Sequence, residues 1–254
     1  MRDDSELEVK RFSELAKKSL DSGYFIFTDF LGLPEQASFA KAKRSFGKIK
    51  YTEFGGAPGT ERVMIRFGDE DELMYSEPFP IKILKISPKS EKYAEELSHR
   101  DYLGSILGLG IERSVIGDIA IRGKEAFVFV KDEIAEYIIG SLEKIRRTDV
   151  RVLEVSESEL PEGELFRTEP LRIQLMGERV DAAIAKVFRL SRDEAERLIA
   201  SARVYVSGAL ATQGSMTPKA GDVISVRGHG RFIYLGASGL SKKGKLNVDV
   251  LLYV

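Results

Sequence analysis

The sequence predicts an α+β protein built from three small domains, and three observations support this fold class. The chain has 254 residues, which exceeds the usual size of a single domain. Helical and strand-like hydrophobic patterns alternate along the chain. An acidic stretch containing Pro161 and Gly163 separates the last third from the rest. We therefore expect an N-terminal α/β domain (residues 1–78), a central domain (79–155), an acidic linker (156–169) and a C-terminal domain (170–254).

The N-terminal domain is predicted from two helical and two strand-like segments. Residues 6–20 place apolar side chains at helical spacing among alternating acids and bases, which indicates a helix. Strands are expected at 25–27 and 63–67, with a second helix between them at 34–46. The glycine cluster at 55–59 is expected to form a loop, because no Gly-Lys-Ser/Thr follows it as in a phosphate-binding loop.

The central domain is predicted to be a ferredoxin-like (split βαβ) sandwich. The expected elements follow the order βαββαβ: a strand at 81–86, a helix from about Ser90, strands at 118–121 and 126–130, a helix at 132–145 and a strand at 150–155. Many RNA-binding domains have this order. Phe127 and Phe129 share one strand face, and we favour core burial over base stacking because the surrounding RNA-recognition consensus is missing.

The C-terminal domain begins with a short amphipathic, basic helix. Val180, Ile184 and Val187 lie at i, i+4 and i+7 and form one apolar stripe. Arg179 and Lys186 remain available to face solvent. The first helix of this domain is therefore predicted to present basic side chains.

A second helix is predicted to begin at about Ser191. Ser191 and Glu194 form a capping-box pattern, in which each side chain bonds the backbone N–H of the other residue. A rotation of about 100° per residue places Arg192 and Glu196 on one flank of this helix, with Arg203 close to it. We expect these arginines to form one basic face beside the core.

Alternating segments at 204–206 and 223–227 predict strands, so that two helices pack on a small twisted sheet. Over roughly residues 171–235 this pattern resembles the alpha-L RNA-binding module, which a small-subunit ribosomal protein shares with pseudouridine synthases and bacterial tyrosyl-tRNA synthetases. Ala202 stands where the module usually has glycine, and Ser207 where it has asparagine. Because a left-handed cap costs a non-glycine residue on the order of 1 kcal/mol, we expect the second helix to end differently here.

Charge is distributed unevenly along the chain. The whole chain has 39 basic and 40 acidic side chains, which does not favour a generic polyanion-binding protein. By segments, the net charge is −3 for residues 1–78, −3 for 79–168 and +5 for 169–254. On charge alone, ordinary surface variation remains an alternative. Combined with the module pattern, the positive last third favours RNA as the partner.

Further motifs lie at residues 28–31, 99–104, 108–113 and 116–118. Together with the C-terminal module they resemble the YlmH family of bacterial RNA-binding proteins over essentially the full chain. The resemblance implies a protein that binds ribosomal RNA of the large subunit and tRNA. It also implies an accessory role in ribosome-associated quality control, when nascent chains are tailed with alanine on obstructed large subunits. Some members of the family were first linked to cell division.

The central motif allows two interpretations. Arg100 and Arg113 could contact phosphate, and His99 could act as an acid or base, which would make a secondary RNA contact. A structural role, with Asp101 bonding the backbone near a helix end, is the favoured alternative. The glycines at 108–110 lack the third glycine and the preceding strand of a dinucleotide fingerprint, so they are expected to form turns.

Enzymatic function is not favoured by the residues present. The chain has no cysteine, and its two histidines lie 130 positions apart, so a zinc site is implausible. Outside the module, the chain has no Arg-Leu-Asp segment that would supply the catalytic aspartate of a pseudouridine synthase. The lysines at 241–245 resemble the lysine loop of a class I tRNA synthetase, but the accompanying His-x-Gly-His element is absent. An RNA-modifying enzyme of the pseudouridine synthase type and a scaffold for cell-division proteins remain as alternatives.

We therefore expect no catalytic residue, cofactor, metal or small-molecule substrate, and a cytoplasmic protein without a membrane segment, because no signal peptide or long apolar run is present. The candidate RNA contacts are basic side chains and hydroxyl groups of the last third of the chain. They are Arg179, Ser191, Arg192, Arg197, Arg203, Ser207, Lys219, Arg227, Arg231, Lys242, Lys243 and Lys245.

Overall fold

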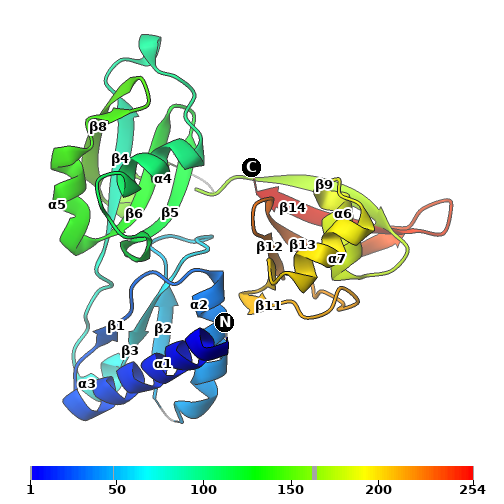
Figure 1. Cartoon of the computed structure of the whole chain (residues 1–254), viewed down its shortest axis with the longest axis horizontal. Helices are drawn as coiled ribbons and strands as arrows, with labels where there is room; N and C mark the ends of the chain where they lie inside the picture. Colours follow the sequence, from blue (N-terminus) through cyan, green and yellow to red (C-terminus); the bar gives the residue numbers. More distant parts are fainter. Residues whose placement is uncertain (1, 48, 162–164, 254) are drawn as a thin grey trace. The chain divides into compact units, whose positions relative to one another are not determined.

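The computed structural model describes residues 2–47, 49–161 and 165–253, and it divides into two compact units, Met1–Phe166 and Arg167–Val254 (Figure 1). Both units contain helices and antiparallel sheets, so the predicted α+β class is confirmed. Among the helices of these ranges, none combines the length and apolar character needed to cross a membrane.

The N-terminal part of the first unit is a three-stranded sheet of order β1-β3-β2 with helices packed on it. Phe12 of the first helix, Phe39 of the second and Phe67 of the central strand are buried together. The strand over 51–54 was not predicted, because most of its side chains are exposed and give no alternating pattern. The elements are α1 (Arg2–Ser22), β1 (Ile26–Phe27), α2 (Leu33–Ala42), η1 (Lys43–Ser45), β2 (Tyr51–Phe54), β3 (Met64–Phe67) and α3 (Glu70–Leu73).

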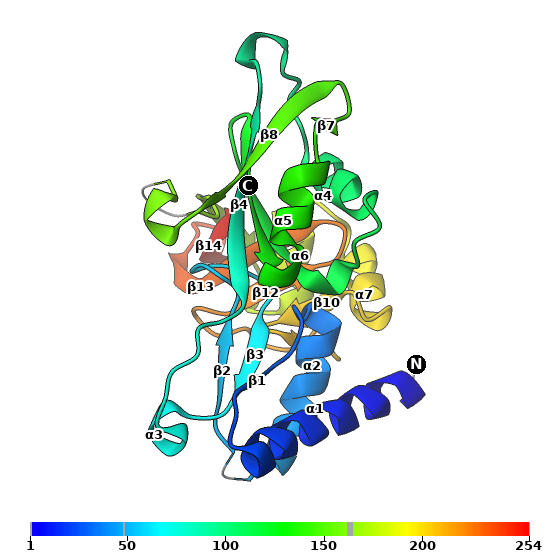
Figure 2. The ribbon, with the colours of Figure 1, turned by 90° about the vertical axis from the view of Figure 1, so that its left-hand side faces the viewer.

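The central part is a five-stranded antiparallel sheet of order β5-β6-β4-β8-β7. The order of its first four strands is the one expected for a βαββαβ chain. Both helices pack on one face of the sheet, where they bury Leu84, Val128 and Ile138 (Figure 2). The elements are β4 (Ile81–Pro88), η2 (Glu91–Tyr93), α4 (His99–Leu107), η3 (Arg113–Val115), β5 (Ile116–Arg122), β6 (Glu125–Lys131), α5 (Asp132–Ser141), β7 (Lys144–Ile145) and β8 (Thr148–Val155).

The two helices of this part are shorter than predicted. A helix from about Ser90 is wrong, since α4 begins at His99, where Ser98 and Asp101 form a capping box. A helix over 132–145 is also wrong in its last turn. The chain leaves α5 after Ser141 and pairs two residues as the edge strand β7. Both boundaries are set by local hydrogen bonding that hydrophobic spacing does not report.

The second face of the central sheet is covered in part by the N-terminal part of the unit. Phe127 and Phe129 are 2% and 0% exposed and pack with Phe30 and Met64 in one apolar cluster. Core burial of the two phenylalanines is therefore confirmed. Because this cluster joins the two parts, residues 1–166 form one compact unit, and the structure shows no separation near the expected domain boundary at residue 78.

The expected acidic linker is partly structured. Residues 157–159 form the short helix η4 (Glu157–Glu159), capped by Ser156 and Glu159. Leu160, Leu165 and Phe166 pack on the cluster around Phe129. Residues 162–164 lie outside the described ranges. The apolar side chains within this stretch explain why most of it belongs to the first unit, although its charge suggested a linker.

The second unit is a six-stranded antiparallel sheet of order β11-β10-β12-β13-β14-β9 with two helices on one face (Figure 1). Val180 and Ile184 of the first helix and Ala195 and Ile199 of the second are buried against the sheet, as predicted. The sheet is larger than predicted, because β14 pairs β9 along its full length. The elements are β9 (Thr168–Leu175), α6 (Val180–Val187), α7 (Arg192–Ala200), β10 (Val204–Val206), β11 (Ala209–Leu210), β12 (Val223–Val226), β13 (Gly230–Leu240) and β14 (Leu246–Tyr253).

The end of α7 corrects an expectation. Ala202 adopts the left-handed conformation with φ of 56°, as glycine would at this position. The N–H of Ala202 bonds the carbonyl of Ile199, and the N–H of Arg203 bonds that of Leu198, which is the Schellman pattern. The helix therefore ends in the usual way, and alanine accepts the strain because the following strand β10 is fixed in the sheet.

Candidate nucleic-acid interface

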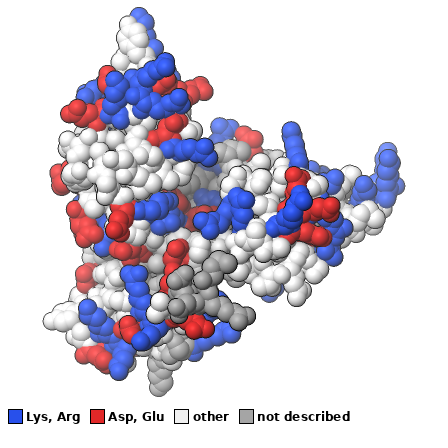
Figure 3. Space-filling model, in the orientation of Figure 1, with Lys and Arg blue, Asp and Glu red and all other residues white. Residues whose placement is uncertain are grey.

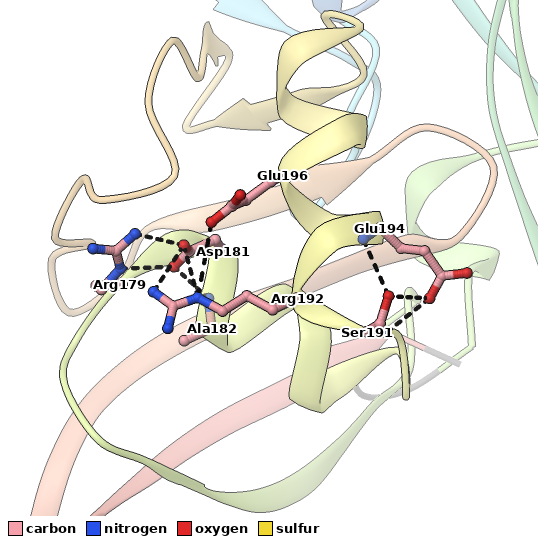
Figure 4. A network of polar contacts seen from close by, with 7 residues as sticks. All are labelled: Arg179, Asp181, Ala182, Ser191, Arg192, Glu194 and Glu196. Carbon is pink, nitrogen blue, oxygen red and sulfur yellow. Dashed lines mark hydrogen bonds and ion pairs between the residues drawn. The ribbon is translucent and has the colours of Figure 1, made fainter.

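Two arginines of the second unit meet on one buried aspartate (Figure 4). Asp181 has no exposed side-chain surface, whereas the side chains of Arg179 and Arg192 are 38% and 56% exposed. Arg179 donates from Nε to Oδ1 at 3.0 Å and from Nη2 to Oδ2 at 2.6 Å. Arg192 donates to Oδ2 from Nε at 3.3 Å and from Nη2 at 3.2 Å. We call Arg179, Asp181 and Arg192 the arginine pair site.

The start of α6 explains why this aspartate is buried. Arg179 is the N-cap residue, and Asp181 lies in the first turn, where its Oδ1 accepts the N–H of Ala182 at 2.7 Å. The loop at Gly214 passes over the carboxylate, since its carbonyl accepts the N–H of Asp181. A Cβ on Gly214 would lie 2.9 Å from the Cβ of Asp181, so only glycine allows this approach.

The electrostatics of the pair site keep all three groups charged. Burial opposes ionisation of Asp181, but the hydrogen bonds from Arg179, Ala182 and Arg192 outweigh it and lower the pKa of its carboxyl group. The three residues alone carry a net charge of +1, and the exposed carboxylate of Glu196, which acts on both arginines, offsets part of it. Each guanidinium uses only Nε and Nη2 toward Asp181, and Glu196 Oε1 lies 3.9 Å from Arg192 Nε. The remaining N–H groups of the two guanidinium groups, whose positions Asp181 fixes, are suited to donate to phosphate oxygens.

The position of Arg192 depends on the helix cap before it. Ser191 Oγ accepts the N–H of Glu194 at 3.2 Å, and the Glu194 carboxylate accepts the N–H of Ser191 at 2.8 Å. The predicted capping box is therefore confirmed. It fixes the first turn of α7 and with it the direction from which Arg192 reaches Asp181.

A second basic cluster lies elsewhere on α7. A groove of about 600 Å³ is lined by Arg197, Arg203 and His229 together with Leu190, Leu198, Ala200, Ser201 and Glu194. Arg203 is held there by a 2.7 Å bond from Nη2 to the carbonyl of Arg227. Arg192 does not line this groove and bonds Asp181 instead, so the two arginines take part in different clusters. Arg192 is the first residue of α7 and Arg203 follows the end of that helix, so the rise of about 1.5 Å per residue separates them along the helix axis.

The other candidates of the C-terminal unit are dispersed. Ser207 donates to Asp222 Oδ1 at 2.8 Å in the turn after β10. The backbone N–H of Lys219 bonds the same aspartate, while its side chain is exposed. Arg227 is exposed beside the groove, and the Arg231 guanidinium lies 4.1 Å from the centre of the Tyr253 ring. None of these four residues belongs to the pair site.

Three lysines lie at the turn between β13 and β14. Lys242 and Lys243 are exposed, and Lys245 is half-buried with its N–H bonded to Ser241 Oγ. Figure 3 shows basic side chains gathered at the outer end of this hairpin. The lysines therefore form a separate basic tip on a long two-stranded ribbon.

In the first unit, the central motif is engaged in structural contacts. Asp101 caps α4 with Ser98 and lies 3.6 Å from Arg146. Arg113 donates to backbone carbonyls of the β5 start, and burial together with the nearby charge of Arg62 lowers its pKa to about 10. His99 and Arg100 are exposed in the first turn of α4. Partial desolvation of the imidazole by its surroundings, together with the charge of Arg113, lowers the pKa of His99.

Sequence reasoning missed the role of Asp181. The sequence gives one signal for this role. Asp181 follows Arg179 by two positions and lies on the apolar side of a short helix, where burying an unpaired carboxylate would cost much free energy. The contribution of His229 to the groove left no sequence signal, because the turn before β13 approaches α7 only in the folded unit.

The fold and these sites define a two-unit α+β protein whose C-terminal unit carries paired and clustered arginines around a two-helix face. Residues 75–159 match a family model described as "Putative RNA-binding domain in YlmH". Over 162 residues the chain is 26% identical to "Ribosome-associated protein quality control protein P2" of Bacillus subtilis (strain 168), which covers 62% of this chain. The chain spans 62% of the length of that curated relative.

A solved structure is also similar. "Cell division protein ylmH from Streptococcus pneumoniae" matches with a TM-score of 0.49 and 23% sequence identity, over 61% of this chain and 93% of that chain. The family model and the Bacillus subtilis relative confirm the resemblance to the YlmH family that the sequence motifs indicate.

Proposed function

We propose that the chain is a non-catalytic RNA-binding protein that binds ribosomal RNA of the large subunit and tRNA. In this proposal it acts as a cytoplasmic accessory factor in ribosome-associated quality control, where stalled nascent chains are tailed with alanine. The observation that carries the proposal is the arginine pair site. Two half-exposed guanidinium groups are held together by one buried carboxylate, which is an arrangement suited to backbone phosphates.

The comparisons support the ribosomal part of the proposal. The family model is described as an RNA-binding domain, and the Bacillus subtilis relative is named for ribosome-associated quality control. The net charge of +5 in residues 169–254 supports a polyanionic partner for the same unit that contains the pair site.

Asp181 is poorly placed for catalysis. A general base or nucleophile must reach a substrate atom, but this carboxylate is fully buried and accepts bonds from two arginines and a backbone N–H. Within the described ranges, no three His, Asp or Glu side chains are grouped closely enough to hold a metal ion. The burial and pairing of Asp181 favour binding over chemistry at this site.

Sedimentation of the tagged full chain in a lysate gradient tests the proposal. We expect migration with free large subunits. The variant R179Q/D181N/R192Q should move to the top of the gradient, because it loses both cations without leaving a buried charge unpaired. The control R172Q/K186Q removes two basic side chains of the same unit outside the pair site and should still migrate with large subunits.

Two results would contradict the proposal. Migration of the unaltered chain at the top of the gradient would remove the ribosomal assignment. Isomerisation of uridine in ribosomal RNA by the purified chain, abolished by D181N, would instead establish an RNA-modifying enzyme.

A further inference from the structure

The face of the central sheet that packs on the N-terminal part continues beyond the apolar cluster. Side chains two positions apart on a strand lie on the same face. On β5 the buried Ala120 is followed by Arg122, and on β8 the half-buried Val155 is preceded by Leu153 and Arg151. The same face therefore changes from apolar to basic along its strands.

The inner strands show the same change. On β4, Ile83 lies in the apolar cluster, and Lys85 is two positions further on. On β6, Phe127 lies in the cluster, and Glu125 is two positions before it. Lys85 Nζ pairs with Glu125 at 2.9 Å and lies 5.9 Å from the centre of the Phe127 ring, which places Lys85 on this face.

Strand pairing aligns these side chains across the sheet. Lys85 is the partner of Phe127 on one side and of Leu153 on the other, and Arg122 is the partner of Glu125. The strand order is β5-β6-β4-β8, so a path from Arg122 to Arg151 crosses three strand spacings, or about 14 Å. We call Lys85, Arg122 and Arg151, together with Leu153, which lies opposite Lys85 on β8, the basic sheet face.

Charge and exposure separate this face from an ordinary solvated surface. Arg151 and Leu153 are exposed, Leu153 to 50%. Among the described residues, no ion pair neutralises Arg122 or Arg151, and Arg122 Nε is buried without a hydrogen-bond partner. Three cations face the carboxylates of Glu125 and of Glu159, on which the charge of Lys85 acts, so the net charge of this face is about +1.

We propose that the basic sheet face is a second RNA-binding site, which contacts the phosphate backbone of a strand laid across β5, β6, β4 and β8. The inference rests on the proposed RNA-binding function and adds a site in the first unit. Base stacking has no part in it, since Phe127 and Phe129 are covered by the N-terminal part. Recognition is therefore by charge, without reading of sequence.

Salt dependence of RNA binding by the full chain tests this site, with a fluorescent 15-nucleotide polyuridine as the probe. The variant R122Q/R151Q removes two cations at nearly constant side-chain size. The slope of log affinity against log salt is negative, and each lost phosphate contact should reduce its magnitude by about 0.7 for single-stranded RNA. The expected decrease in magnitude for R122Q/R151Q is therefore about 1.4. The control K92Q/K144Q removes two exposed cations of the same domain and should leave the slope unchanged.

The outcomes distinguish this site from the proposed function. If the unaltered chain binds the probe and R122Q/R151Q keeps the same slope with unchanged thermal unfolding, the basic sheet face is not a site, while RNA binding stands. If the unaltered chain binds neither the probe nor ribosomal RNA, both proposals are wrong. A decrease equal to that of K92Q/K144Q would indicate only a general charge effect and would also overturn the site.

Discussion

The buried carboxylate of Asp181 accepts two parallel hydrogen bonds from Arg179, at 3.0 Å from Nε and at 2.6 Å from Nη2. Arg192 shares the same carboxylate from the neighbouring helix. Asp181 therefore links the starts of α6 and α7 and fixes the separation of two cations. Consequences for stability and for RNA binding follow from this one arrangement.

The two arginines should be energetically coupled. In R179A or R192A the carboxylate keeps one guanidinium partner, but the double variant leaves it buried without a cation. We expect the loss of unfolding free energy in the double variant to exceed the sum of the single losses by about 1–3 kcal/mol. Hydrogen exchange of amides in residues 167–254 measures it. R192A with R203A, which lie in different clusters, should instead be additive within about 0.5 kcal/mol.

Asp181 should make the second unit sensitive to acid. Its pKa is lowered in the folded state, so its contribution to stability is present above the unfolded pKa of about 3.9 and is lost as the pH falls through the folded value. Between pH 6 and pH 3, D181N should lose less unfolding free energy than the unaltered chain. Equal losses in denaturant titrations at the two pH values would show that the carboxylate is not stabilised by the arginines.

The left-handed residue at the end of α7 offers a stabilising change. Ala202 has φ of 56°, which costs an L-residue about 1 kcal/mol and glycine almost nothing. A202G should therefore raise the unfolding free energy of the second unit by about 0.5–1 kcal/mol, as measured by hydrogen exchange. A200G, two residues earlier and within the helix, should lower it by a similar amount.

Arg62 should hold the two parts of the first unit together. Its guanidinium donates to the carbonyls of Phe30 at 2.7 Å, Ile116 at 2.9 Å and Arg113 at 3.2 Å. R62A would leave these acceptors without the donor, and we expect a loss on the order of 3 kcal/mol. Limited proteolysis of residues 1–166 should become faster. R100A, which removes an exposed arginine, should have no effect beyond about 0.5 kcal/mol.

Local patterns were sufficient to predict much of the fold. The capping box at Ser191 and the apolar stripe of Val180 and Ile184 each depend on residues within one or two turns, and both are present in the structure. Strand order in the central sheet followed from the sequence of elements, because few topologies are open to a βαββαβ chain.

Features that depend on distant segments could not be predicted in this way. The cluster around Phe129 combines side chains from Phe30 to Phe166, so the joining of the first two expected domains left no local signal. Arg192 and Arg203 take part in different clusters because they lie at opposite ends of α7, which the angle of helical rotation alone does not show. The arginines of both clusters were named from the sequence, but Asp181, His229 and the division into clusters were not.

The salt dependence of binding to large-subunit ribosomal RNA tests the central claim most directly. We expect R179Q/D181N/R192Q to reduce the magnitude of the slope of log affinity against log salt by about 1.8 relative to the unaltered chain, because two phosphate contacts to a duplex are lost. The control R172Q/K186Q should keep the original slope. If the triple variant binds with an unchanged slope and affinity, the arginine pair site does not contact RNA.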